Sequence, residues 1–86
     1  MTEFTHIIKD ALGIHARPAG KLVKTAAEFK SEITIECREK TGDAKRIFAV
    51  MGLGGRCGDE ITFRIEGSDE DEAREKILVI NLNLTI

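Results

Sequence analysis

The feature that most constrains the fold is a strict alternation of apolar and polar residues in two short segments, 33–38 and 61–66. The apolar members are Ile33, Ile35 and Cys37 in the first segment and Ile61, Phe63 and Ile65 in the second. Successive side chains of a β-strand point to opposite faces, so the pattern predicts two strands that are each buried on one side only. A sheet built from such strands needs a second layer over one of its faces.

Segments with helical and strand patterns surround these two strands. Residues 16–29 carry an apolar stripe at helical spacing, formed by Leu22, Val23, Ala26 and Phe29. Residues 4–8 predict a short first strand, and residues 40–44 predict a short edge strand that returns as a hairpin. Residues 46–51 are followed by several glycines and predict only one or two helical turns.

The last segment of the chain begins with signals of a helix start. Asp69 and Glu72 have the spacing of a capping box, and the acidic first turn suits the helix dipole. The apolar face of this helix consists of Ala73, Ile77, Ile80 and Leu84. Residues 80–86 alternate like a strand, so we expect the helix to continue through at least Ile80 and to end irregularly.

The predicted order of elements is β-α-β-β-α-β-α. This order predicts an α+β fold of the open-faced β-sandwich type, with a four-stranded antiparallel sheet and three helices on one face. The 86 residues suffice for a single domain, residues 1–86. The chain has no tryptophan or tyrosine, so its core must consist of aliphatic side chains and phenylalanine.

Composition argues against several classes of function. The net charge of −2 disfavours bulk nucleic-acid binding. Cys37 and Cys57 form no CxxC pair, and no His cluster completes a metal site, so we expect no metal and no cofactor. No apolar run approaches the roughly 20 residues of a membrane span, and no secretory signal is recognised, so a cytoplasmic location is expected. The glycines of residues 52–58 lack the pattern of a nucleotide loop and are expected in turns.

The strongest functional signal is the string Gly13-Ile14-His15-Ala16-Arg17-Pro18-Ala19-Gly20. Pro18 is the only proline of the chain, and proline is favoured in the first turn of a helix. His15 is therefore expected at the helix start, where free N–H groups and the positive end of the dipole favour anions. Arg17 adds a fixed positive charge, so the pattern suits an imidazole that carries a phosphoryl group. His6, by contrast, lies in the first predicted strand and is interpreted as structural or exposed.

This string resembles the active-site motif of HPr, the histidine-containing phosphocarrier family of the sugar phosphotransferase system. The resemblance continues in register, without gaps, through residues 25–29, 31–34, 40–41, 44–45, 51–54, 58–67, 69–70 and 73. It implies a carrier rather than an enzyme, which receives a phosphoryl group from Enzyme I and passes it to IIA domains of sugar permeases. It further implies that His15 carries the phosphate on Nδ1, that Arg17 shields it, and that the helix start at Ala16, Arg17 and Pro18 cradles it.

The resemblance also implies a surface that binds these partners. Its expected members are Gly20, Lys24, Lys45, Arg46, Ile47, Phe48 and Met51. We expect Ile47 and Phe48 to be exposed, because an apolar docking patch requires it. The alternative is that the three basic residues form an ordinary solvated surface and that the apolar ones belong to the core. A carrier that visits two partners in turn is expected to be a monomer.

Two positions depart from the family pattern. Arg46 stands where many Gram-positive members have a serine that a regulatory kinase phosphorylates, so that modification is expected to be absent. Leu12 stands where members usually carry Ser or Asn. These departures leave open a regulatory HPr-like paralogue that acts through protein–protein binding, without serine phosphorylation at position 46. A ferredoxin-like module for metal or RNA is disfavoured, because ligand clusters and stacking aromatics are missing.

Overall fold

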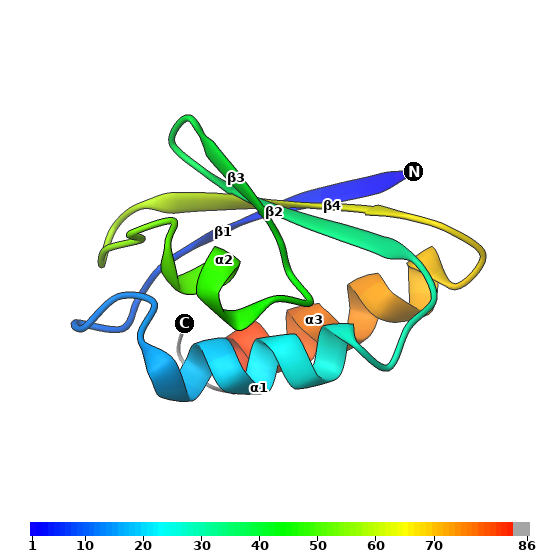
Figure 1. Cartoon of the computed structure of the whole chain (residues 1–86), viewed down its shortest axis with the longest axis horizontal. Coiled ribbons are helices and arrows are strands. Elements are labelled where there is room, and N and C mark those ends of the chain that lie inside the picture. Colours follow the sequence, from blue (N-terminus) through cyan, green and yellow to red (C-terminus); the bar gives the residue numbers. More distant parts are fainter. Residues whose placement is uncertain (84–86) are drawn as a thin grey trace.

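The computed structural model describes the backbone of residues 1–83 and the side chains of residues 1–80. The elements follow one another in the predicted order (Figure 1). They are β1 (Thr2–Ile7), α1 (Ala16–Ala26), β2 (Glu32–Cys37), β3 (Lys40–Asp43), α2 (Ile47–Met51), β4 (Glu60–Glu66) and α3 (Glu70–Asn83).

The four strands form one antiparallel sheet in the order β1-β4-β2-β3. β4 lies between β1 and β2, and its Phe63 is paired with Phe4 on one side and Ile35 on the other. The rings of Phe4 and Phe63 stack with their centroids 5.0 Å apart. The short β3 lies at the edge, as its sequence predicted.

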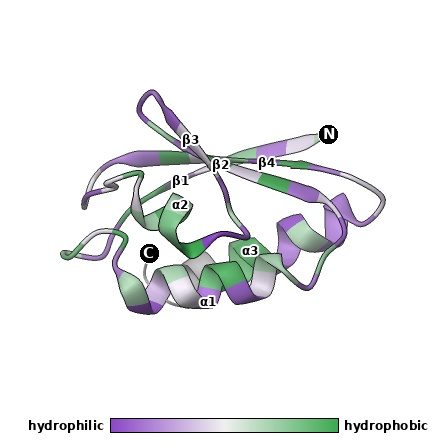
Figure 2. Cartoon of the chain, in the orientation of Figure 1, coloured by the Kyte–Doolittle hydropathy of each residue, from purple (hydrophilic) through white to green (hydrophobic). Residues whose placement is uncertain are grey.

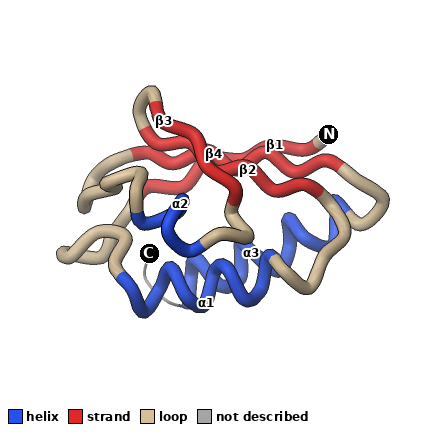
Figure 3. The backbone as a smooth tube through the Cα atoms, viewed as in Figure 1, coloured by secondary structure: helices blue, strands red, loops and turns tan. Residues whose placement is uncertain are grey.

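The three helices cover one face of the sheet and leave the other face open (Figure 3). All six apolar members of the two alternating segments are buried beneath this helical layer. The helices contribute Leu22 and Ala26 from α1, Val50 from α2, and Ala73 and Ile77 from α3. Figure 2 shows the apolar and polar residues alternating along the strands. The predicted open-faced sandwich is therefore confirmed.

Helix α1 ends three residues earlier than its apolar stripe suggested. Ala26 is the last helical residue, and the N–H groups of Glu28 and Phe29 donate to carbonyls only three positions back, at 3.1 and 3.2 Å. Such bonds tighten the end of a helix into a turn of 3₁₀ type. Phe29 still packs against the core from this turn. The apolar stripe therefore predicted correctly that Phe29 faces the core, but not that it lies in a turn.

The start of α3 differs from the predicted capping box. The Asp69 carboxylate accepts hydrogen bonds from the N–H groups of Lys30 and Ser31, at 2.8 and 3.0 Å, and from the Ser31 hydroxyl. The pairing of Asp69 with Glu72 was therefore wrong, because Asp69 joins α3 to the α1–β2 turn instead. Glu70 is the residue that reaches back to a backbone N–H, that of Gly67. The helix runs past Ile80 as expected, and Leu84 lies outside the described residues.

The Asp69 contacts predict a loss of stability in acid. The Ser31 hydroxyl and then the Lys30 amide hold the pKa of the Asp69 carboxyl below its ordinary value of 3.8. A carboxyl whose pKa is lowered by folding stabilises the fold above its unfolded pKa, and this contribution is lost as the pH falls through the folded value. We therefore expect the melting temperature to fall between about pH 5 and about pH 2, and to fall less in Asp69→Asn.

Thermal melts of both proteins across this range measure the effect. Asp71→Asn is the matched control, because Asp71 lies in the same first turn of α3 and has no side-chain hydrogen bond within the part of the chain that the structure describes. It should keep the acid sensitivity of the unmodified protein. An Asp69→Asn variant with undiminished acid sensitivity would show that Asp69 is not a source of the effect.

Candidate functional site

His15 lies at the N-terminus of α1, as the sequence predicted. Its backbone is extended (φ −116°, ψ −175°), and its carbonyl accepts the first bond of the helix, from the N–H of Ala19 at 3.0 Å. The His15 side chain makes no capping hydrogen bond to the helix, and about a third of it is exposed. The imidazole is therefore held at the helix end and remains accessible.

The imidazole has a polar contact with the side chain of Asp10, a residue that the sequence did not single out. The Asp10 Oδ2 atom lies 3.1 Å from Nε2 of His15, and Oδ1 accepts the N–H of Leu12 at 2.9 Å. The Leu12 amide and then the His15 ring hold the pKa of the Asp10 carboxyl below its ordinary value of 3.8. The spacing Asp10-x-x-Gly13, typical of a turn closed by an aspartate side chain, was the available signal.

A second loop fixes the turn that carries His15. Gly13 has a φ of +71°, and the N–H of Ile14 donates to the carbonyl of Gly55 at 3.0 Å. Ile14 is buried against this loop, and Gly55 packs closely on it, since a Cβ at Gly55 would lie 2.7 Å from Cδ1 of Ile8 and 2.9 Å from Cδ1 of Ile14. Gly55, one of the glycines predicted to lie in turns, therefore supports the backbone that leads into His15.

The first turn of α1 offers two free donors and one cation. Ala16 and Arg17 carry N–H groups without helical partners, whereas Pro18, at the third helical position, has no N–H and is buried. The expected cradle of residues 16–18 is thus reduced to two backbone donors. The Arg17 side chain is exposed, and among residues 1–80 it has no ion-pair or hydrogen-bond partner. The first turn contains no acidic residue that would oppose an anion.

Helix α2 presents one of its two expected apolar residues to solvent. Phe48 is 85% exposed, and Met51 is 36% exposed. Ile47 differs from the prediction, because it is only partly exposed and packs against the core. Gly20 of α1 lies beside Ile47, since a Cβ at Gly20 would be at an ordinary contact distance, 3.9 Å, from Cδ1 of Ile47. Gly20 and Ile47 thus lie where α1 meets α2, and the exposed apolar side chains of α2 are Phe48 and, to a smaller extent, Met51.

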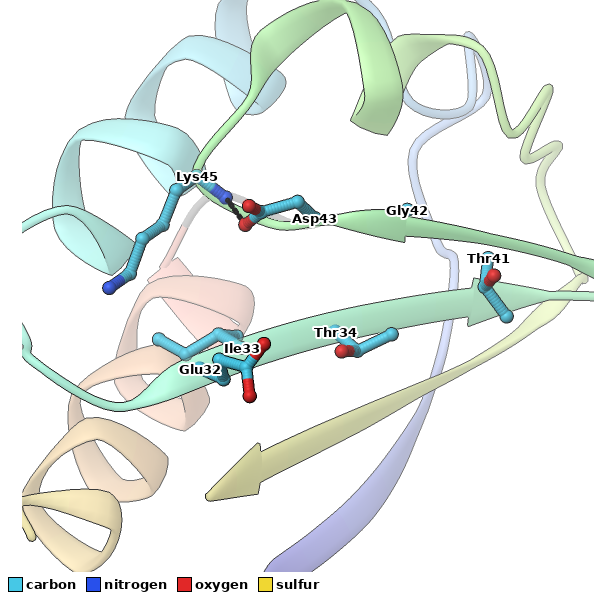
Figure 4. Close-up of a pocket in the computed structure, with 7 residues that line it drawn as sticks. All are labelled: Glu32, Ile33, Thr34, Thr41, Gly42, Asp43 and Lys45. Atoms are coloured by element: carbon cyan, nitrogen blue, oxygen red, sulfur yellow. Dashed lines mark hydrogen bonds between the residues drawn. The ribbon is translucent and has the colours of Figure 1, made fainter. Parts of the chain in front are cut away.

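The three basic residues assigned to the same surface have different surroundings. Lys24 lies exposed in the last turn of α1, and Arg46 lies exposed at the N-cap of α2. The Nζ atom of Lys45 instead donates to the carbonyl of Phe29 at 2.8 Å, beyond the end of α1. Figure 4 shows the Lys45 side chain extending away from Asp43, whose carboxylate accepts the Lys45 N–H. This contact gives Lys45 a structural role.

Neither a metal-binding cluster nor a membrane-spanning helix is found among the described residues. No group of three or more His, Cys, Asp or Glu side chains in that part of the chain could hold a metal ion. Within the same residues, no helix combines the length and the apolar character that crossing a membrane requires.

Comparison with known proteins identifies the family. The model of the family described as "PTS HPr component phosphorylation site" matches residues 2–80, which is most of the chain. The chain belongs to the HPr family. The phosphocarrier protein HPr of Mycoplasma capricolum subsp. capricolum is 46% identical to it over 77 residues, covering 90% of this chain and 86% of the relative. HPr of Lysinibacillus sphaericus is 45% identical over 78 residues, covering 91% and 86%.

A solved HPr structure has the same fold. It is the histidine-containing phosphocarrier protein, described in a study of the divergence of Mycoplasma from Gram-positive bacteria. It matches with a TM-score of 0.96 at 40% identity and covers 98% of this chain and 96% of that one. The expected family and the open-faced sandwich are therefore confirmed, and the chain is an HPr-type phosphocarrier.

Proposed function

We propose that this HPr accepts a phosphoryl group on Nδ1 of His15 from Enzyme I, which takes it from phosphoenolpyruvate, and passes it to IIA domains of sugar permeases. The observation that carries the proposal is the placement of His15. Its partly exposed imidazole lies at the N-terminus of α1 and is not used to cap the helix. A nucleophile that must meet two partner proteins in turn needs this accessibility.

The surroundings of His15 suit a phosphoryl group that is held and then released. The helix dipole contributes ~0.3–1 kcal/mol toward an anion at this end. The N–H groups of Ala16 and Arg17 have no partner within the helix. The Arg17 guanidinium, which has no partner among the described side chains, can add charge-assisted hydrogen bonds. Contacts of this size stabilise the phosphoryl group but still allow its transfer. The transfer barrier itself is lowered chiefly by positioning of the reactants and by neutralisation of charge.

Phe48 supports an apolar contact with the partner proteins. An exposed phenylalanine is energetically unfavourable in water, and aromatic side chains buried at an interface often dominate its binding energy. Arg17, Lys24 and Arg46 are exposed cations that favour acidic partners and speed encounter. Lys45 is left out of this proposed surface because it binds the Phe29 carbonyl.

Replacement of Phe48 by alanine should raise the KM of Enzyme I for this protein by roughly tenfold, because the variant lacks the proposed aromatic contact with Enzyme I. The melting temperature should stay close to that of the unmodified protein, since the Phe48 side chain is 85% exposed. Steady-state transfer from phosphorylated Enzyme I measures the effect. Val79→Ala is the matched control, because Val79 is an exposed apolar residue on α3, 53% exposed. Equal KM values for all three proteins would show that Phe48 does not contact Enzyme I.

Transfer along the whole route tests the proposed function. The protein is incubated with Enzyme I, Mg²⁺ and labelled phosphoenolpyruvate, and a IIA domain is then added. Acid-labile label should appear on the protein and then move to the IIA domain. Absence of label would contradict the proposal. Label that forms but does not move, or moves slowly compared with a sugar-system carrier, would favour the regulatory paralogue that Arg46 and Leu12 left open.

A further inference from the structure

The contact between Asp10 and His15 bears on which ring nitrogen of His15 reacts. Asp10 precedes the helix by six residues, yet its carboxylate lies 3.1 Å from Nε2 of His15. Both of its oxygens have defined partners, since Oδ1 accepts the Leu12 N–H at 2.9 Å and Oδ2 faces the ring. The Gly13 N–H also donates to the Asp10 carbonyl at 2.9 Å, so the turn holds the carboxylate in place.

The chemistry of the two groups decides where the imidazole proton lies. An ionised carboxylate can only accept hydrogen bonds, so Nε2 must donate the proton. The Asp10 carboxyl, whose pKa lies below its ordinary value of 3.8, is ionised at neutral pH. In the neutral ring the other nitrogen, Nδ1, then holds a free lone pair. Nδ1 has no hydrogen-bond partner among residues 1–80, so within this part of the chain the lone pair is available to a reacting group.

We propose that Asp10 is a positioning residue for phosphoryl transfer: its carboxylate holds the Nε2 proton of His15 and so makes Nδ1 the nucleophile. This inference rests on the proposed function. The Nδ1 lone pair forms the new bond to phosphorus, the bond between phosphorus and the donor atom of Enzyme I breaks, and its electron pair stays with the donor. The Nε2 proton is retained throughout, and the Asp10 carboxylate balances the positive charge that develops on the ring. Donation to a IIA domain reverses these steps.

Asp10→Asn is the informative variant, because it keeps the shape of the side chain and reverses the direction of its hydrogen bond with Nε2 of His15. The Leu12 N–H is a fixed donor, so the amide oxygen of the new side chain must face it. The amide NH₂ then faces Nε2 and can only donate to it. The ring proton moves to Nδ1, where it blocks the nucleophile. A merely structural aspartate would instead be replaced well by asparagine and poorly by alanine.

Two measurements test the proposal. Nitrogen-15 NMR of the His15 ring at alkaline pH, where imidazole is neutral, should show the proton on Nε2 in the unmodified protein and a shift toward Nδ1 in Asp10→Asn. Phosphorylation by Enzyme I should be roughly 10- to 100-fold slower in Asp10→Asn, and no faster than in Asp10→Ala. Melting curves check that both variants are folded.

Asp43→Asn is the matched control, because the Asp43 carboxylate accepts the N–H of Lys45, two residues on, in the same kind of turn without a histidine. It should be phosphorylated at the unmodified rate. A folded Asp10→Asn protein with the unmodified rate, or with the proton still on Nε2, would overturn the assignment of Asp10. An unmodified protein that takes no label would instead overturn the proposed function, so the two failures are distinguishable.

Discussion

His15→Ala should take up no label from Enzyme I and phosphoenolpyruvate, while its melting temperature stays close to that of the unmodified protein. The imidazole is the proposed acceptor, so its removal leaves no nucleophile at the start of α1. The fold should tolerate the change because the side chain is partly exposed and makes no capping bond, and its one polar contact in the described part of the chain is with Asp10.

His6→Ala is the matched control for this experiment. His6 is the other histidine of the chain and lies in β1, paired in register with Ile61 of β4. It should take up label at the unmodified rate once a melting curve has shown that it is folded. Label that persists in His15→Ala at the unmodified level would mean that another residue accepts the phosphoryl group.

Gly13→Ala should lower the free energy of unfolding by about 2–5 kcal/mol. Two costs combine at this position. The φ of +71° is unfavourable for any residue with a Cβ, and the added methyl carbon would lie 2.2 Å from the carbonyl oxygen of Gly55. That oxygen is backbone and accepts the Ile14 N–H, so it cannot move aside without breaking the bond that holds the His15 turn. Urea denaturation measures the loss.

Gly54→Ala separates the two costs. Gly54 has a similar φ of +66°, but nothing lies within 4 Å of its added Cβ. It should lose only the conformational part, about 1–2 kcal/mol. If the two variants lost the same free energy, the close approach of residue 13 to Gly55 would not exist in solution.

The layered fold could be predicted because its signals are local. The alternation of Ile61, Phe63 and Ile65 is a property of one strand, and burial on one face follows directly from it. Pro18 similarly marks the start of α1. The position of His15 at that start followed from the proline alone, and no tertiary contact was needed to predict it.

The remaining features depend on contacts between segments distant in the sequence. Asp69 was predicted to cap its own helix, but its carboxylate reaches Lys30 and Ser31, which no local pattern encodes. The partial burial of Ile47 and the exposure of Phe48 depend on where α1 crosses α2. Two adjacent apolar residues in a five-residue helix do not show which of them will face α1. The contact of Lys45 with Phe29 and that of Asp10 with His15 were missed for the same reason.

The most direct test of the proposed function locates the phosphoryl group on the phosphorylated protein. The protein is labelled with nitrogen-15, phosphorylated by Enzyme I and phosphoenolpyruvate, and examined by NMR for coupling between phosphorus-31 and ring nitrogen. We expect a single phosphoryl group, coupled to Nδ1 of His15. Coupling to Nε2, or phosphorus bound to any residue other than His15, would contradict the proposed function.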